Sequence, residues 1–413
     1  MLDCDALRIK CETREVISKL YQSRVAKKGF GSIGNIQFES KDAFLARFVE
    51  QTRHAESVFP TADEIIVIGD VHADMLSFIT ALRLGNVVDA DYILVPCKHT
   101  RIVVQMGDVL DRRVRAGNNT TTSENEREEL DLLQYMYLLD EFATASSSNT
   151  RIVSLCGNHD IYNFGGNDDA HLKQFSRIAR SYTTDITNRG FDLPNGFPGR
   201  SVFFSIGPMS GAAQYMVQHR PILLQIGTWL FVHGGLDYNT LAKIDRCNKA
   251  SVKLLQPNGL VKFINIVYYA VMLRNTAWLN MCAARCTDKN MGDEMRLGLL
   301  PRAWCNLIEY RGQGTEAPCN ASRSIEIGGL FNLGVPWKNG DGGFCVSHTP
   351  QAQGVNSGCD PLVFRVDVGL SESFGRKSHR SAAPFQILRI RPKSNHVYSL
   401  EAATTSEKVQ RLR

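Results

Sequence analysis

Short apolar runs rich in β-branched residues recur along the chain. They occupy residues 64–69, 101–107, 151–157, 229–235 and 343–348. Their apolar character is nearly continuous and lacks polar alternation, so the pattern predicts strands that are buried on both faces.

An amphipathic helix is predicted between the second and third of these runs. It carries Leu130, Leu133, Met136, Tyr137 and Phe142 on one side, which is typical of a helix that packs one face on a core. Strands that alternate with helices favour an α/β fold, with one sheet packed on another and helices outside.

The length of 413 residues exceeds the about 250–300 residues that one compact core usually holds. We therefore expect one large domain with additions, or two domains. The expected parts are an N-terminal helical extension over residues 1–55, the main domain over 60–395, and a polar, frayed C-terminal tail over 396–413.

Composition and charge narrow the class of protein. Hydrophobic residues make up 43% of the chain and charged residues 22%, which is ordinary for a soluble globular protein. The net charge of +5 is spread without a Lys/Arg block, so neither a nucleic-acid partner nor a membrane partner is expected.

Targeting and redox signals are equally plain. We find no secretory signal, and the apolar stretch 263–273 is shorter than the about 18–20 residues that span a bilayer, so a cytoplasmic location is the default expectation. The 11 cysteines form no tight framework, and we expect most of them to be reduced and buried.

Each strand-like run ends in residue types that bind metals. Gly69 is followed by Asp70 and His72, and Gly107 by Asp108, Asp111 and Arg112. Gly157 precedes Asn158, His159 and Asp160; His233 comes before two glycines, and His348 ends the fifth run. Because α/β folds place their sites at the carboxyl ends of strands, we expect these side chains to meet.

The residue types predict a site for two divalent metal ions. Asp70 and His72 leave one tight turn toward the first ion, and Asp108 bridges both ions because a carboxylate has two oxygens. Asn158, His233 and His348 complete the second ion. Mixed nitrogen and oxygen ligands suit Mn²⁺ first, with Fe or Zn²⁺ as alternatives.

Two such ions, roughly 3.5–4 Å apart, activate water and clamp the oxygens of a displacement at phosphorus. In this interpretation His159 is the general acid for the leaving alkoxide, and Asp111 orients its ring. Arg112 offers a bidentate fork to the phosphoryl oxygens. Asp111 also has a plainer interpretation as a helix N-cap.

The motifs resemble those of calcineurin-like metallophosphoesterases. Gly69-Asp-Val-His, Gly107-Asp-Val-Leu-Asp-Arg, Gly157-Asn-His-Asp, His233-Gly-Gly and Ser347-His-Thr-Pro occur in that family's order. Segments 347–359 and 364–371, with Asn163-Phe-Gly-Gly, resemble the Shewanella-like branch of the phosphoprotein phosphatases.

The resemblance covers about residues 60–392. It implies the four-layer α/β/β/α sandwich of metallophosphoesterases, with two β-sheets flanked by helices. It also implies hydrolysis of phosphoserine or phosphothreonine in a phosphorylated protein or peptide, with phosphotyrosine left open. The family's second phosphate-binding arginine matches Arg311, with Arg274 as competitor and a surface ion pair as the plain alternative.

This chain departs from the family pattern at four places. Ala73 and Arg113 stand where the family has Gly, Asp160 stands for Glu, and Ser347 stands for Gly. None of them removes a predicted ligand, so they bear on substrate choice more than on activity.

Two other functions are compatible with the same residues. One is a phosphoesterase for dinucleoside polyphosphates or other nucleotides, with the same metal centre. The other is a catalytically silent module that binds metal or phosphopeptide. The sequence gives no indication of a regulatory subunit.

Overall fold

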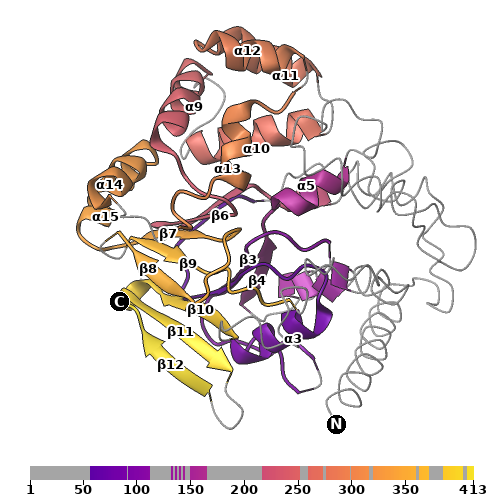
Figure 1. Cartoon of the computed structure of the whole chain (residues 1–413), viewed down its shortest axis with the longest axis vertical. Helices are drawn as coiled ribbons and strands as arrows, with labels where there is room; N and C mark the ends of the chain where they lie inside the picture. Colours follow the sequence, from indigo (N-terminus) through magenta and orange to yellow (C-terminus); the bar gives the residue numbers. More distant parts are fainter. Residues whose placement is uncertain are drawn as a thin grey trace, which may run out of the picture.

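Figure 1 shows the computed structural model of the chain. The structure describes residues 56–413 except for 91, 112–131, 134, 137–138, 141–142, 145–148, 165–215, 252–258, 273–275, 298, 316–319, 360–361, 372–384 and 403–406. The expected extension over residues 1–55 lies outside the described residues.

One sheet has six strands in the order β1-β5-β6-β7-β9-β8. They are β1 (Val58–Phe59), β5 (Leu223–Ile226), β6 (Trp229–Val232), β7 (Gly343–Val346), β8 (Asn356–Gly358) and β9 (Val363–Arg365). β6, β7 and β9 are parallel, and Val232 of β6 pairs with Val346 of β7. The segments after β6 and β7 therefore leave the sheet at the same edge.

The second sheet also has six strands, in the order β12-β11-β10-β2-β3-β4. They are β2 (Glu64–Ile68), β3 (Arg101–Gln105), β4 (Thr150–Ser154), β10 (Gln386–Arg391), β11 (His396–Ala402) and β12 (Glu407–Arg411). β2, β3 and β4 are parallel and in register, with Ile68 beside Gln105 and Gln105 beside Ser154. All five predicted strands are thus confirmed, and β2 and β3 are buried along their whole length.

Helices flank the two sheets. They are α3 (Met75–Leu84), α5 (Asn158–Phe164), α9 (Tyr238–Ser251), α10 (Gly259–Met272), α11 (Thr276–Arg285), α12 (Lys289–Arg296), α13 (Arg302–Glu309), α14 (Ala321–Leu330) and α15 (Gly334–Lys338), with a short 3-10 helix, η5 (Pro392–Ser394). In Figure 1, α9 to α13 lie on the side of the first sheet and α3 lies on the side of the second. The predicted α/β/β/α sandwich is confirmed.

Two apolar clusters hold these layers together. The cluster between the sheets includes Val103 from β3 with Phe231 and Phe364 from the first sheet. The other joins the first sheet to its helices through Leu230, Phe263 and Trp304. Burying side chains of this size contributes about 1.5–3 kcal/mol each, so the layers fix the strand ends that carry the polar residues.

The long apolar stretch noted in the sequence belongs to α10, which is buried along most of its length. Among the described helices, none combines the length and the apolar character needed to cross a membrane.

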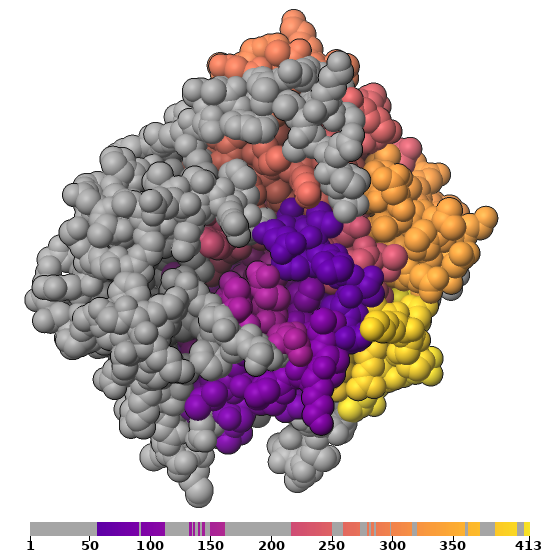
Figure 2. Space-filling view, turned by 180° about the vertical axis from the view of Figure 1, so that it is seen from behind, coloured from indigo at the N-terminus to yellow at the C-terminus, as the bar shows by residue number. Residues whose placement is uncertain are grey.

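The expectation of a frayed tail over residues 396–413 is wrong. β11 pairs with β10 over its length and β12 pairs with β11, so this segment forms one edge of the second sheet. Figure 2 shows these C-terminal strands at the surface beside the segment that contains α15. There Asn395 Nδ2 donates to the carbonyl of Gly340 at 2.5 Å, and Arg413 donates to that of Gly342 at 2.8 Å. Segment 396–413 is polar because it lies at an edge of the sheet, where one face and one side remain in water.

The described residues of the predicted helix around 130–142 are helical; Met136 is buried and Leu133 is partly buried against both apolar clusters, while Leu130, Tyr137 and Phe142 lie outside the described residues. One further expectation needs correction. The expectation of reduced cysteines is wrong for Cys247 and Cys286, which form a disulfide between α9 and the end of α11. Packing of these two helices brings together cysteines that lie 39 residues apart.

Candidate metal centre

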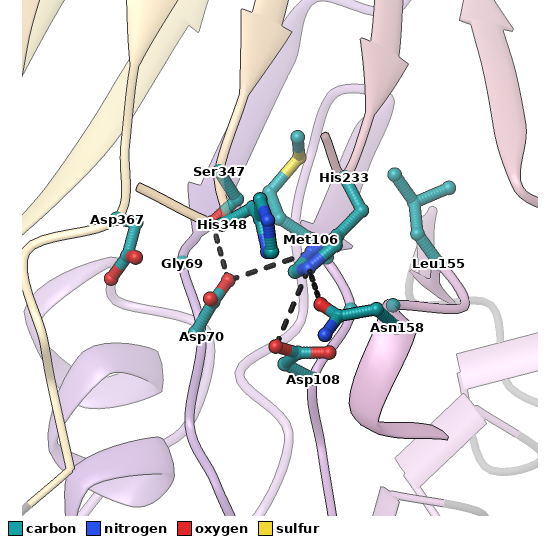
Figure 3. A network of polar contacts seen from close by, with 12 residues as sticks. Gly69, Asp70, Met106, Asp108, Leu155, Asn158, His233, Ser347, His348 and Asp367 are labelled. Carbon is teal, nitrogen blue, oxygen red and sulfur yellow. Dashed lines mark hydrogen bonds and ion pairs between the residues drawn. The ribbon is translucent and has the colours of Figure 1, made fainter. Parts of the chain in front are cut away.

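The six predicted ligands converge where the carboxyl ends of two sets of parallel strands meet, β2 to β4 in one sheet and β6 with β7 in the other. They come from the segments after β2, β3, β4, β6 and β7, and the structure buries all of them: Asp70, His72, Asp108, Asn158, His233 and His348. Figure 3 shows Asp70, Asp108, Asn158, His233 and His348 gathered in one place. The carboxyl-end placement argued from the sequence is therefore what the fold provides.

Tight turns bring these side chains out of the strands. His72, Asp108 and His348 have φ angles of 40°, 53° and 66°, in the left-handed region that non-glycine residues rarely adopt. Such strained backbone concentrates at functional sites. Gly157 is required for a different reason, since a Cβ there would collide with the Asp108 carboxylate.

The first potential metal-binding group consists of His72, Asp108 and His159, whose ligand atoms lie within 4.8 Å of one another. His72 Nε2 is 3.9 Å from Asp108 Oδ2, while its Nδ1 is 3.1 Å from the carbonyl oxygen of Leu110. A backbone acceptor at Nδ1 fixes the ring so that Nε2 faces the carboxylate, the arrangement common for ligating histidines.

The second group consists of Asp108, His233 and His348. His233 Nε2 lies 3.4 Å from Asp108 Oδ2 and 3.0 Å from Asn158 Oδ1, and its Nδ1 donates to the carbonyl oxygen of Met106 at 2.9 Å. Asp108 thus belongs to both groups, which is the position expected of a bridging carboxylate. Asp70 borders them, with Oδ1 3.7 Å from His233 Nδ1.

The electrostatics are those of buried charges gathered closely together. Burial and the neighbouring charge of Asp367 raise the pKa of Asp70 well above its ordinary value. Burial opposes ionisation of Asp108, but the charges of His233 and His159 outweigh it and keep the Asp108 pKa well below its ordinary value. Burial also lowers the pKa of His348 to about 2, reinforced by His233.

These donors fit divalent metal ions. Carboxylate oxygens, imidazole nitrogens and an amide oxygen suit Mn²⁺, Fe or Zn²⁺, and neither group contains a thiolate. Buried charged groups are normally paired or bound to metal, because desolvation of an isolated charge costs far more. Buried His/Asp groups that can hold metal are therefore present, while the assignment of each ligand stays a prediction.

The expected acid, His159, is itself a member of the first group, and its expected partner Asp111 lies next to it. Asp111 Oδ2 is 3.0 Å from His159 Nδ1, and both side chains are buried. The backbone N–H of His159 donates to Asp108 Oδ1 at 2.8 Å, and its ring packs edge-on against His72. Asp111 therefore lies where an orienting carboxylate is needed.

Of the predicted phosphate-binding arginines, the structure describes Arg311 alone; Arg112 and Arg274 lie outside the described residues. Arg311 is exposed, and its Nη1 donates to the carbonyl oxygen of His348 at 3.2 Å. The guanidinium thus reaches the rim of the second group.

No protein-family model matches the chain. Its structure is similar to the cold-active protein-tyrosine phosphatase of a psychrophilic Shewanella species, with a TM-score of 0.54 and 16% identity over 88% of this chain and 84% of that one. A further structure of a cold-active protein tyrosine phosphatase gives a TM-score of 0.53 at 16% identity, covering 87% and 82%. The chain has the calcineurin-like phosphoesterase fold. At this identity the likeness concerns the fold.

Within this phosphoesterase fold, the site is supported by three polar residues to which the sequence analysis assigned no role. Asp160 Oδ1 accepts from the backbone N–H groups of Val109 and Leu110 at 3.1 and 3.2 Å, and its Oδ2 accepts from Gly157 at 3.0 Å. It therefore ties the loop after β3 to the loop after β4. The other two are Ser347 and Asp367, which lie beside Asp70 (Figure 3).

Glu64, Cys97 and His99 form a third group of possible ligands, away from the strand ends. Glu64 Oε2 already pairs with Arg101 Nε at 2.8 Å, and its Oε1 pairs with Arg389 Nε at 3.3 Å. Two guanidinium groups repel a cation, so we assign no metal there.

Proposed function

We propose that the chain is a metal-dependent phosphoprotein phosphatase that hydrolyses phosphoserine and phosphothreonine monoesters. One observation carries the proposal. Two groups of buried ligand atoms share Asp108, and His159, which belongs to the first of them, is hydrogen-bonded to Asp111. Metal-dependent phosphoester hydrolysis needs a clamp for two ions and an oriented acid next to it.

In this proposal Asp70, His72 and Asp108 hold one ion, and Asp108, Asn158, His233 and His348 hold the other. When bound, the two ions supply an activated water and neutralise phosphoryl oxygens. The role of the chain is to fix the ligands, and the carbonyl oxygens of Leu110 and Met106 do this for His72 and His233.

His159 delivers the proton to the leaving oxygen of the serine or threonine. Its Nδ1 donates to Asp111, so Nε2 is the nitrogen that carries the transferable proton. The Asp111 carboxylate stabilises the protonated imidazole and sets the plane of the ring. A serine alkoxide is a poor leaving group, so proton donation is worth about 10²–10⁴ in rate.

Arg311 and Arg112 bind the phosphoryl oxygens in the proposal. Support for Arg311 is its hydrogen bond to the backbone of His348, which keeps its charge at the rim of the site. A guanidinium presents parallel donors that match two phosphoryl oxygens.

Phosphotyrosine is the second candidate substrate. The structurally similar Shewanella protein is named a protein-tyrosine phosphatase, and this favours testing phosphotyrosine beside the other two. The metal groups and the pair His159–Asp111 would serve either ester, since the reaction at phosphorus is the same.

The test is phosphate release by EDTA-treated protein, with and without added Mn²⁺, from phosphoserine, phosphothreonine and phosphotyrosine peptides and from a dinucleoside tetraphosphate. We expect Mn²⁺-dependent turnover of the phosphoserine and phosphothreonine peptides, a loss of at least about 10³-fold in Asp108→Ala, and normal rates in the matched surface variant Asp293→Asn.

Three results would contradict the proposal. Selective turnover of the dinucleoside tetraphosphate would assign the same centre to nucleotides. Tight binding of phosphopeptide without release of phosphate would favour a silent binding module. Near-full, metal-dependent activity of Asp108→Ala would show that the metal centre proposed around Asp108 is not the site of the reaction.

A further inference from the structure

Ser347 lies at the end of β7, directly before the predicted ligand His348. Its hydroxyl donates a hydrogen bond of 2.5 Å to Asp70 Oδ1, which comes from the segment after β2 in the other sheet. Exposed fractions of 1% for Ser347 and 2% for Asp70 show that this contact is shielded from solvent. Figure 3 shows the contact from close by.

The backbone around Ser347 fixes the position of its hydroxyl. The N–H of Ser347 donates to the carbonyl oxygen of His233 at 2.8 Å, and the N–H of Thr349 donates to the carbonyl oxygen of Ser347 at 2.7 Å. Ser347 therefore joins three segments that carry predicted ligands: those of Asp70, His233 and His348. A glycine would keep these backbone contacts and lose only the side-chain bond.

The two oxygens of Asp70 differ in their surroundings. Oδ1 faces the Ser347 hydroxyl and lies 3.7 Å from His233 Nδ1. Among the described residues, Ser347 donates the resolved hydrogen bond to this carboxylate, and the acceptor is Oδ1. Asp70 is also buried beside Asp367, whose negative charge disfavours a second carboxylate at this place.

We propose that Ser347 is a positioning residue for the metal centre: its hydroxyl holds Oδ1 of Asp70 and so fixes the orientation of the carboxylate that would serve the ion shared by Asp70, His72 and Asp108. The proposal deepens the function proposed above and rests on its two-metal centre. Groups that orient a metal ligand typically change metal affinity 10–100-fold.

The asymmetry of the contact gives a specific expectation. Ser347 touches Asp70, which serves the first ion, and its side chain makes no resolved hydrogen bond to Asn158, His233 or His348. Loss of the hydroxyl should therefore weaken the first ion by about 10–100-fold and leave the affinity for the second ion within about threefold.

The experiment is a calorimetric titration of Mn²⁺ into full-length, metal-free protein for the wild type, Ser347→Ala, Ser347→Gly and Ser347→Thr. Reference variants Asp70→Asn and His348→Ala identify which binding step belongs to which ion. Ser399→Ala on β11 is the matched control, because Ser399 is equally buried at 1% and lies in the second sheet two strands from β2.

We expect the Ala and Gly variants to lose affinity in the step that Asp70→Asn also removes, while Thr, which keeps the hydroxyl, restores it to within about threefold. Thermal unfolding in EDTA establishes that each variant is folded, and Gly replaces Ala if Ala is not.

Unchanged affinity in Ala and Gly would overturn the proposal. So would equal losses in both steps, which indicate a general disturbance, or a Thr variant as weak as Ala. Failure of the wild type to bind two ions would instead overturn the metal centre itself, which separates this inference from the function on which it rests.

Discussion

Asp111 Oδ2 lies 3.0 Å from His159 Nδ1, although the two residues follow different strands, β3 and β4. The contact depends on the parallel pairing of these strands, in which Gln105 at the end of β3 lies beside Ser154 at the end of β4. Because Nδ1 is occupied, the ring can offer only Nε2 to a substrate. In the proposed reaction, Nε2 is therefore the atom of this pair that donates the proton.

Replacing Asp111 by Asn should reveal this role through the leaving group. We expect kcat on a phosphoserine peptide to fall about 10–100-fold, because the protonated imidazole loses its partner. With p-nitrophenyl phosphate the fall should be several times smaller, since p-nitrophenolate leaves without protonation. The measurement is kcat on both substrates, and His159→Ala should show the same ordering with larger losses. Equal losses on both substrates would speak for a structural role of Asp111.

Asp160 is expected to matter for stability more than for chemistry. Its carboxylate accepts from three buried backbone N–H groups, and a buried donor left without an acceptor costs about 1–3 kcal/mol. Asp160→Ala should therefore lower the free energy of unfolding of the metal-free protein by about 3 kcal/mol or more, measured in urea.

The matched control for Asp160 is Asp288→Ala. Asp288 accepts from one backbone N–H, that of Met291, as the N-cap of α12. Its loss should cost about 1 kcal/mol. If the two variants proved equally stable, Asp160 would not be the tie between the loops after β3 and β4.

A strand or a site residue could be predicted from the sequence where its neighbours in space are also its neighbours along the chain. Residues 64–68 and 101–105 were recognisable as strands because both of their faces are apolar. The strand His396–Ala402 was not, because its buried Val397 and Leu400 are separated by Tyr398 and by Ser399, a polar residue that is nevertheless buried in the strand between β10 and β12. Polar sequences of this kind are ambiguous until their pairing partner is known.

The same distinction applies to the site. Asp70, His72 and Asp108 were identifiable because ligand types follow Gly at the ends of apolar runs. Ser347 and Asp160 were noticed only as departures from a family pattern. Their contacts join residues 277 and about 50 positions apart, which no local pattern encodes.

Arg311 should contribute to substrate binding through a loop that Gln313 holds in place. The Gln313 side chain accepts from Leu236 N at 3.1 Å and donates to Leu236 O at 2.6 Å, next to the segment of His233. We expect Arg311→Ala to raise KM for a phosphopeptide about 10-fold with a smaller change in kcat.

Gln313→Met, which has a similar length and neither polar group, should raise KM in the same direction by a smaller factor. Arg323→Ala, which removes an exposed ion pair with Glu326 on α14, is the control and should leave both constants unchanged. An Arg311→Ala enzyme with wild-type KM would assign the phosphate contact to another arginine.

Asp140 should make stability depend on pH. Burial raises its pKa from 3.8 to about 6, against the charge of Arg151. The folded protein therefore binds this proton more tightly than the unfolded chain does. The stability that this provides is complete below pH 3.8 and is lost as the pH rises through about 6, up to roughly 3 kcal/mol in all.

Asp140→Asn stays neutral at every pH and should avoid that loss. We expect the variant to gain stability relative to the wild type between pH 5 and pH 8, measured by urea unfolding at both values. Asp293→Asn, whose carboxylate is about half exposed, should show no such trend. A stability difference for Asp140→Asn that is the same at both pH values would contradict the assignment.

Asp70 should support metal binding while it lowers the stability of the metal-free protein. Its carboxylate is buried beside Asp367, and both the burial and the neighbouring charge disfavour its ionised form when no metal is bound. Asp70→Asn keeps an oxygen for Ser347 and removes the charge, so in EDTA the variant should melt roughly 2–5 °C above the wild type. Mn²⁺ should raise the melting temperature of the wild type by mass action and that of the variant much less.

The check is thermal unfolding of both proteins in EDTA and in Mn²⁺, with Asp293→Asn as control. A variant that melts below the wild type in EDTA would mean that Asp70 serves the fold as much as the metal.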